Sequence, residues 1–190
     1  MSGATFPSYL KTTNNLPNFS DFEAYIKDAL GLVSVVITGT PQEAQLQRMF
    51  LGAVEWLEKS CSISIAVNTF EYVNIDTKTD CYLIVYNIQS ISEVMFFNFC
   101  DTEGKLLEPS EFKLLIPNVF ICCPFKLLCF DAIKITFVAG YATIPECVKL
   151  AIARIVAYMY QNGLTSCCEA LNCLHKEVAA LLKSTKPIIL

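Results

Sequence analysis

One segment of the chain, residues 130–163, places a strand, a tight turn and a helix directly in series. Ile133, Ile135 and Phe137 alternate with polar residues, which is the period of a half-buried strand. Gly140 follows almost at once, and a strand-to-helix reversal favours a residue that tolerates positive φ or a close backbone approach. Pro145 then begins a predicted helix. The segment therefore predicts a fold that contains both β-sheet and α-helix.

Composition narrows the class of protein further. A chain of 190 residues predicts one domain, with an arm at either end. Its 54% hydrophobic and 17% charged residues are sufficient for a sizeable core. The net charge of −4 and the pI near 5.0 argue against a protein that grips nucleic acid through its phosphates, because such binding needs a basic patch. The acidic balance suits a surface past which DNA slides, and solubility alone explains it equally well.

No targeting or membrane-spanning segment is recognisable in the sequence. Residues 1–17 lack the apolar stretch of a signal peptide. No run reaches the ~18 uninterrupted apolar residues of a membrane span: Leu32–Ile37 is too short, and Val119–Phe130 is interrupted by a proline and a lysine. We therefore expect a soluble, cytosolic protein.

The sequence contains 10 cysteines but no Cys-x-x-Cys pair. Without a secretion signal a disulfide framework is not expected, and within apolar runs a thiol acts as a small hydrophobe. Cys167, Cys168, Cys173 and His175 are the one cluster of soft ligands. It could hold zinc or supply a cysteine nucleophile with its base, but the ligand spacing of a standard zinc site is absent.

Phosphate-binding and hydrolase motifs are absent as well. The sequence has no glycine-rich phosphate loop and no Gly-x-Ser-x-Gly elbow. We therefore predict no catalytic residue, no metal and no cofactor.

Periodicity predicts helices, then strands, then helices. The first two helices are signalled by capping boxes, Ser20 with Glu23 and Thr40 with Glu43, and the first should end at Gly31. The helices are expected at residues 20–30, 41–60, 145–161 and 166–182. The strands are expected at Ala66–Ile75, Cys81–Tyr86, Ser92–Phe99, Phe112–Leu115, Val119–Cys122 and Ala132–Val138.

These elements predict an α+β fold, a bundle of about four helices with an inserted small antiparallel β region. The expected organisation is an N-terminal arm at residues 1–18, one domain at residues 19–183 and a C-terminal tail at residues 184–190.

The strand, the Ala-Gly-Tyr turn at 139–141, Ile144-Pro145 and a helix ending in Tyr-x-Asn resemble the signature of phage head–tail connector proteins. These are the portal adaptors of long-tailed bacteriophages and gene-transfer particles. The resemblance covers roughly residues 19–182 and includes the apolar strand at 91–97 with its Asp-x-x-Gly turn at 101–104. It marks Gly140 and Tyr141 as the structural turn and Pro145 as the helix start.

The resemblance implies a virion neck protein, assembled in the host cytoplasm, that forms a ring of about twelve copies beneath the portal. Its partners would be itself, the portal protein and a stopper or tail-completion protein. Packaged DNA would pass through without sequence-specific binding, and no membrane would be involved. Portal contact would fall on the basic and apolar end of the chain: Lys183, Lys186, Pro187, Ile188, Ile189 and Leu190.

Two other functions stay open at this point. The chain could be another neck component, such as a stopper or tail terminator, or a cytosolic enzyme that uses a cysteine of the 167–175 cluster. Charge is also uneven, with eight acids against two bases from Glu71 to Glu111 and six bases against three acids from Lys134 onward. This asymmetry fits either two solvated faces or docking of each region on a partner of opposite charge.

Overall fold

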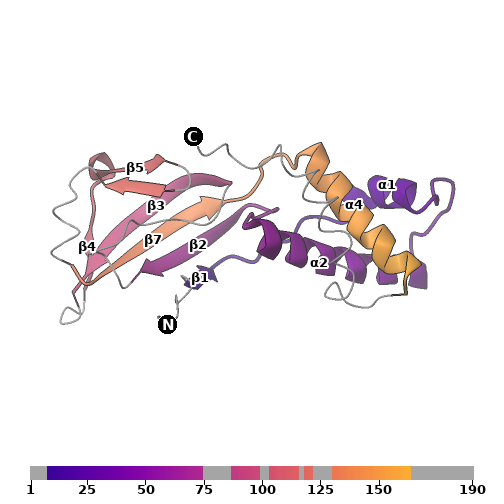
Figure 1. Ribbon diagram of the computed structural model, residues 1–190, viewed down its shortest axis with the longest axis horizontal. Coiled ribbons are helices and arrows are strands. Elements are labelled where there is room, and N and C mark those ends of the chain that lie inside the picture. Colours follow the sequence, from indigo (N-terminus) through magenta and orange to yellow (C-terminus); the bar gives the residue numbers. More distant parts are fainter. Residues whose placement is uncertain (1–7, 75–86, 99–102, 116–117, 122–129, 164–190) are drawn as a thin grey trace, which may run out of the picture. The chain divides into compact units, whose positions relative to one another are not determined.

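The computed structural model describes residues 8–74, 87–98, 103–115, 118–121 and 130–163 (Figure 1). The chain divides into two compact units. A sheet unit takes the described residues up to Asn15 together with Ala66–Gly140, and a helical unit takes Leu16–Ile65 and the residues from Tyr141 onward. The chain thus passes from one unit to the other three times.

The sheet unit is built on five antiparallel strands in the order β1-β2-β7-β3-β4. The strands are β1 (Ser8–Lys11), β2 (Asn68–Asn74), β3 (Ile88–Phe97), β4 (Lys105–Leu106) and β7 (Ala132–Ala139). A short 3-10 helix, Pro109–Glu111, precedes a separate hairpin of β5 (Phe112–Leu115) and β6 (Asn118–Ile121).

One face of the sheet carries the core of this unit. Alternate residues of β7 are buried, and the register sets Phe137 opposite Phe70 and Ile135 opposite Tyr72. Phe70 and Phe137 stack with ring centroids 5.4 Å apart. Phe112 of β5 packs against the same core. The buried members of the core are Tyr72, Ile88, Val94, Phe96, Leu107, Ile133, Ile135, Phe137 and Ala139.

The helical unit contains α1 (Ser20–Ala29), α2 (Pro41–Cys61) and α4 (Glu146–Gln161), and α4 packs against both other helices. Phe50 of α2 is central, with its ring 4.9 Å from that of Phe22 and 5.5 Å from that of Phe19. The buried residues of the three helices follow the helical period: Phe22, Ile26, Leu46, Met49, Phe50, Ala53, Val54, Leu57, Val148, Ala151, Ile152, Ala153, Ile155, Val156, Ala157 and Met159.

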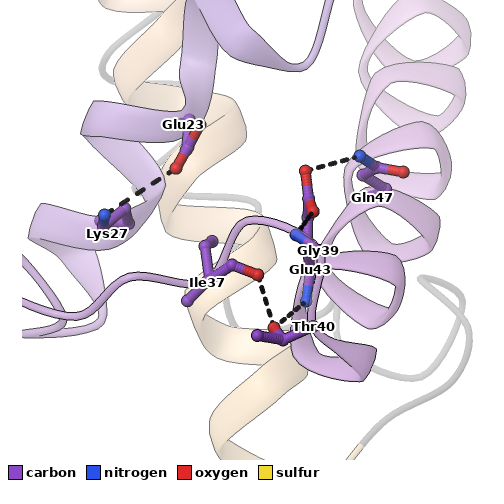
Figure 2. Close-up of polar contacts among 7 residues, drawn as sticks. All are labelled: Glu23, Lys27, Ile37, Gly39, Thr40, Glu43 and Gln47. Atoms are coloured by element: carbon purple, nitrogen blue, oxygen red, sulfur yellow. Dashed lines mark hydrogen bonds and ion pairs between the residues drawn. The ribbon is translucent and has the colours of Figure 1, made fainter.

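One of the two predicted N-terminal capping boxes is wrong and the other is shifted by one residue (Figure 2). Thr40 Oγ1 accepts a hydrogen bond from the Glu43 amide at 3.3 Å, as expected, but the Glu43 carboxylate accepts from Gly39 rather than from Thr40. At α1 the predicted Ser20–Glu23 box does not form: the Ser20 amide donates to Asn18 Oδ1 at 3.3 Å, and Glu23 lies 3.8 Å from Lys27. The threonine predicted to cap α2 therefore does so, whereas the side chain that bonds the start of α1 is Asn18 and not the predicted Ser20.

The predicted bundle of about four helices with a small inserted β region is wrong. The described residues contain three α-helices, and the five-stranded sheet has its own core instead of serving as a minor insertion. The prediction undercounted the sheet because β1 lies in the stretch taken as an arm and β4 is only two residues long. The predicted helix at 166–182 and strand at 81–86 lie outside the described residues.

Candidate functional site

Gly140 directly follows β7, at a point where the sheet unit leaves no room for a side chain. Its φ is +138°, and a Cβ atom there would lie 2.3 Å from the carbonyl oxygen of Ala66 and 2.5 Å from the Cα of Val67. Its amide donates to the Asn87 carbonyl at 3.1 Å, and its carbonyl accepts from Gln89 Nε2 at 2.9 Å. Both the backbone conformation and the close approach require glycine at this position.

The residues that follow belong to the helical unit. The Tyr141 amide donates to the Ile65 carbonyl at 3.3 Å. Pro145 caps α4 in an extended conformation, and its carbonyl accepts from the amides of Val148 and Lys149 at 3.0 and 3.2 Å. Proline suits this position because the N–H groups at the start of a helix have no acceptor within the helix, and proline has no N–H to leave unpaired.

Asn68 is a structural residue that the sequence analysis missed. Asn68 is 1% exposed, and its side chain bonds both backbone groups of Asn15. Its Oδ1 accepts from the Asn15 amide at 2.7 Å, and its Nδ2 donates to the Asn15 carbonyl at 3.1 Å. Nδ2 also lies 3.1 Å from the carbonyl oxygen of Ala66. The one available signal is an asparagine at the start of a strand pattern, where this residue type is depleted.

The valine loop (residues 31–39) joins α1 to α2 and contains no charged residue. Val36 is 81% exposed, Val33 68% and Val35 39%, whereas Ile37 is buried. Apolar residues gathered on an exposed surface commonly mark an interaction site. In the sequence, residues 32–37 stand out only as an apolar run too short for a membrane span, since an apolar run alone does not reveal that it faces solvent.

Hydrogen bonds hold the valine loop at both ends. At its start the Leu32 amide donates to the Lys27 carbonyl at 2.8 Å. At its end the Gly39 amide donates to Glu43 Oε2 at 2.6 Å, and Thr40 Oγ1 donates to the Ile37 carbonyl (Figure 2). Gln47 Nε2 in turn donates to the other Glu43 oxygen at 3.2 Å. The valines are therefore presented by a loop whose two ends are fixed.

A groove of about 390 Å³ lies between α1 and α4, within the helical unit. Three alanines and the half-exposed Leu150 form its apolar part. The full lining is Tyr25, Asp28, Ala29, Leu150, Ala153, Arg154, Ala157, Tyr158 and Gln161. The groove is thus mostly apolar, and its one acid and one base balance in charge.

Tyr25 at the edge of this groove is held by two contacts with α4. Its hydroxyl donates to Glu146 Oε2 at 2.7 Å, and Lys149 Nζ lies 5.4 Å from the centre of its ring. The hydrogen bond to the Glu146 carboxylate raises the pKa of Tyr25 above its ordinary value of 10.0, because ionisation would remove the proton that makes this bond; burial and the nearby negative charge of Glu146 act in the same direction.

Several residues singled out from the sequence lie outside the described part of the chain. They are the predicted portal-contact residues Lys183, Lys186, Pro187, Ile188, Ile189 and Leu190, and the soft-ligand cluster Cys167, Cys168, Cys173 and His175. Across the ranges that the structure describes, no three His, Cys, Asp or Glu side chains gather as a metal site. No helix in those ranges is long and apolar enough to span a bilayer.

The chain matches solved structures but no known sequence family. Neither a protein-family model nor a curated protein sequence matches the chain. A chain in the neck of the native gene transfer agent particle, computed with C12 symmetry, superposes with a TM-score of 0.61 at 12% identity. The match covers 96% of this chain and 97% of that one.

Two further solved structures agree. A chain in the neck of the empty gene transfer agent particle, computed with C6 symmetry, gives a TM-score of 0.60 at 13% identity, over 81% of this chain and 84% of that one. A chain in the virion of the native particle gives 0.59 at 14% identity, over 80% and 84%. At these identities the likeness establishes a shared fold.

Proposed function

We propose that this chain is a structural protein of the neck of a phage-like particle, and more narrowly a head–tail connector that forms a ring beneath the portal. The observation that carries the proposal is the two-way match with a neck protein, over 96% of this chain and 97% of the other. Because both units take part in that match, the whole described architecture is shared, and not merely a common sheet or helix pair.

Rotational symmetry supports the ring. The matched chains come from neck structures computed with C12 and C6 symmetry. In a ring each copy contacts two neighbours through two different surfaces. By analogy with the twelvefold structure we propose about twelve copies, with the portal on one side of the ring and a stopper or tail-completion protein on the other.

The proposed mechanism is mechanical. The ring would lengthen the portal channel, let DNA pass, and offer a docking face to the next neck protein. The net charge of −4 disfavours retention of DNA through its phosphates. The chain end from Lys183 to Leu190 is proposed as the portal contact, because its basic and apolar residues could combine charge complementarity with apolar burial on a partner.

The test is to mix the purified chain with the portal protein of the same particle and to image the mixture by electron microscopy. We expect rings of about twelvefold symmetry stacked on the portal. Truncation after Lys183 should abolish portal binding in a pull-down and leave thermal unfolding unchanged. A chain that stays monomeric and never joins the portal would refute the proposal. A ring that binds only the tail side would identify another neck component.

A further inference from the structure

We propose that the valine loop of one copy inserts into the α1–α4 groove of the next copy, and that this contact closes the ring. The inference rests on the proposed function, since it names the interface that a ring of this chain would use. It requires a protruding apolar surface, a concave surface that fits it, and a reason for the two to meet in different copies.

The valine loop provides the protruding surface. Val33 and Val36 are exposed by 68% and 81%, and their removal from water on binding is favourable by the hydrophobic effect. Because the loop ends are bonded to Lys27 and Glu43, little conformational entropy would be lost when the loop binds. An apolar tip on a fixed base is therefore suited to a pocket of matching chemistry.

The α1–α4 groove provides the concave surface. Ala29, Ala153 and Ala157 leave room between the helices, and Leu150 adds an apolar wall. The hydrogen bond from Tyr25 to Glu146 joins α1 to α4 beside the groove. The loop carries no charge of its own, so it would set no like charge against Asp28 or Arg154 of the groove lining.

The partner follows from symmetry. A ring needs two different complementary surfaces on every copy, and this pair lies on one compact unit, where loop and groove keep a fixed spacing. The uncharged loop offers nothing to nucleic acid, which is bound through basic residues. Three valines also fall far short of the apolar surface of a membrane anchor. A second copy of this chain is therefore the occupant that we assign.

The direct test is photo-crosslinking in the assembled ring. A benzophenone amino acid is placed at Val36 of a ¹⁵N-labelled full-length chain, which is mixed with unlabelled wild-type chain and portal protein. We expect a crosslink from the labelled chain to an unlabelled peptide of α1 or α4 that borders the groove. Crosslinks confined to the portal, to the same chain or to another surface, while rings form, would overturn the inference.

A reciprocal pair of variants tests whether the two surfaces match. Val33→Ser with Val36→Ser should raise the concentration required for self-association by about tenfold or more, and Leu150→Glu in the groove should do the same. Since each variant keeps one intact surface, an equimolar mixture should form a one-to-one pair that neither forms alone. The matched control is Val73→Ser, at a 45% exposed valine of β2, which should assemble as wild type does.

The outcomes separate this inference from the proposed function. If wild-type chain and portal form no ring, the proposed function fails and the inference fails with it. If rings form, yet the loop and groove variants assemble like wild type or their mixture gives no pair, only the inference is overturned. Circular dichroism should show unchanged folding for all variants, because the substituted side chains are exposed.

Discussion

The sheet unit and the helical unit are held together by different kinds of contact. In the sheet unit, β1 pairs with β2 so that Lys11 lies opposite Phe70, and Asn68 bonds Asn15 across 53 residues of sequence. In the helical unit, the valine loop and the start of α2 are fixed by bonds that span only three to five residues. Long-range pairing therefore fixes β1 in the sheet unit, whereas short-range bonds fix the valine loop and the start of α2. The helical unit also has long-range contacts, such as the bond from Tyr25 to Glu146 across 121 residues.

The substitution expected to affect one unit most, and thus to test the difference between the two units most strongly, is Gly140→Ala. A Cβ atom there would collide with the backbone of Ala66 and Val67, so we expect a loss of about 3 kcal/mol or more in the free energy of unfolding of the sheet unit. Amide exchange of β2 and β7 should report the loss. Trp56, the single tryptophan, lies in α2, so its fluorescence reports on the helical unit separately.

The matched control for Gly140 is Gly31→Ala in the valine loop. Gly31 also has a positive φ, +69°, but nothing lies within 4 Å of a Cβ atom there. Its substitution should cost only about 1 kcal/mol, the usual penalty of a left-handed alanine. Equal losses at the two glycines would show that backbone approach is not what distinguishes Gly140.

A second, smaller effect is expected from Asn68→Ala. The change removes the bonds to both backbone groups of Asn15 and to Ala66, which should cost about 2 kcal/mol and speed amide exchange in β1. Asn15→Ala is the control, because it removes only an exposed bond to the Val67 carbonyl. If the β1 amides of the Asn68 variant exchange as slowly as those of wild type, the bonds from Asn68 to Asn15 do not hold β1 in place.

In the helical unit the expected loss at the cap of α2 is smaller, because that cap is a single short-range contact. Thr40→Ala removes the cap of α2 and should cost about 1 kcal/mol, read by Trp56 fluorescence during urea unfolding. Thr38→Ala, at an exposed neighbouring threonine, should leave the transition unchanged. If both variants shift it alike, the cap is not the cause.

The smallest effect is a pH dependence at Tyr25. Folding raises the pKa of Tyr25 above 10.0, so the folded chain holds this proton more tightly than the unfolded chain. The stabilisation is therefore present below about pH 10 and lost as pH rises through the folded pKa. The difference in melting temperature between wild type and Tyr25→Phe should shrink over that range; a constant difference would refute the coupling to Glu146.

Elements with strong local signals could be read from the sequence almost residue by residue. The Thr40-Pro41 start of α2, the strand at Phe112–Leu115 and the helix that begins after Pro145 were all predicted to within one residue. Their signals are periodicity, caps and proline, which act within a few residues. The signal at Ser20 gave the start of α1 correctly but the wrong capping side chain, because Asn18 and not Ser20 supplies the oxygen that bonds the Ser20 amide.

Features that depend on distant partners could not be read in this way. β1 is four residues long and is defined by its pairing with β2 about sixty residues later, so nothing in its own sequence separates it from an arm. Asn68 looks like an ordinary polar residue until Asn15 is brought beside it. The exposure of the valine loop was equally hidden, because apolar residues are expected inside.

The threading of β1 into the sheet limits how such a protein can be recombined. A chimaera that grafts only residues 66–140 from a relative would leave the resident β1 and Asn15 facing a foreign β2 edge. Unless that edge carried a side chain equivalent to Asn68, the backbone groups of Asn15 would lose their partners. Exchange of the sheet unit therefore has to move two separate stretches of the gene together, one for β1 to Asn15 and one for residues 66–140. Exchange of the second stretch alone is expected to yield a misfolded hybrid.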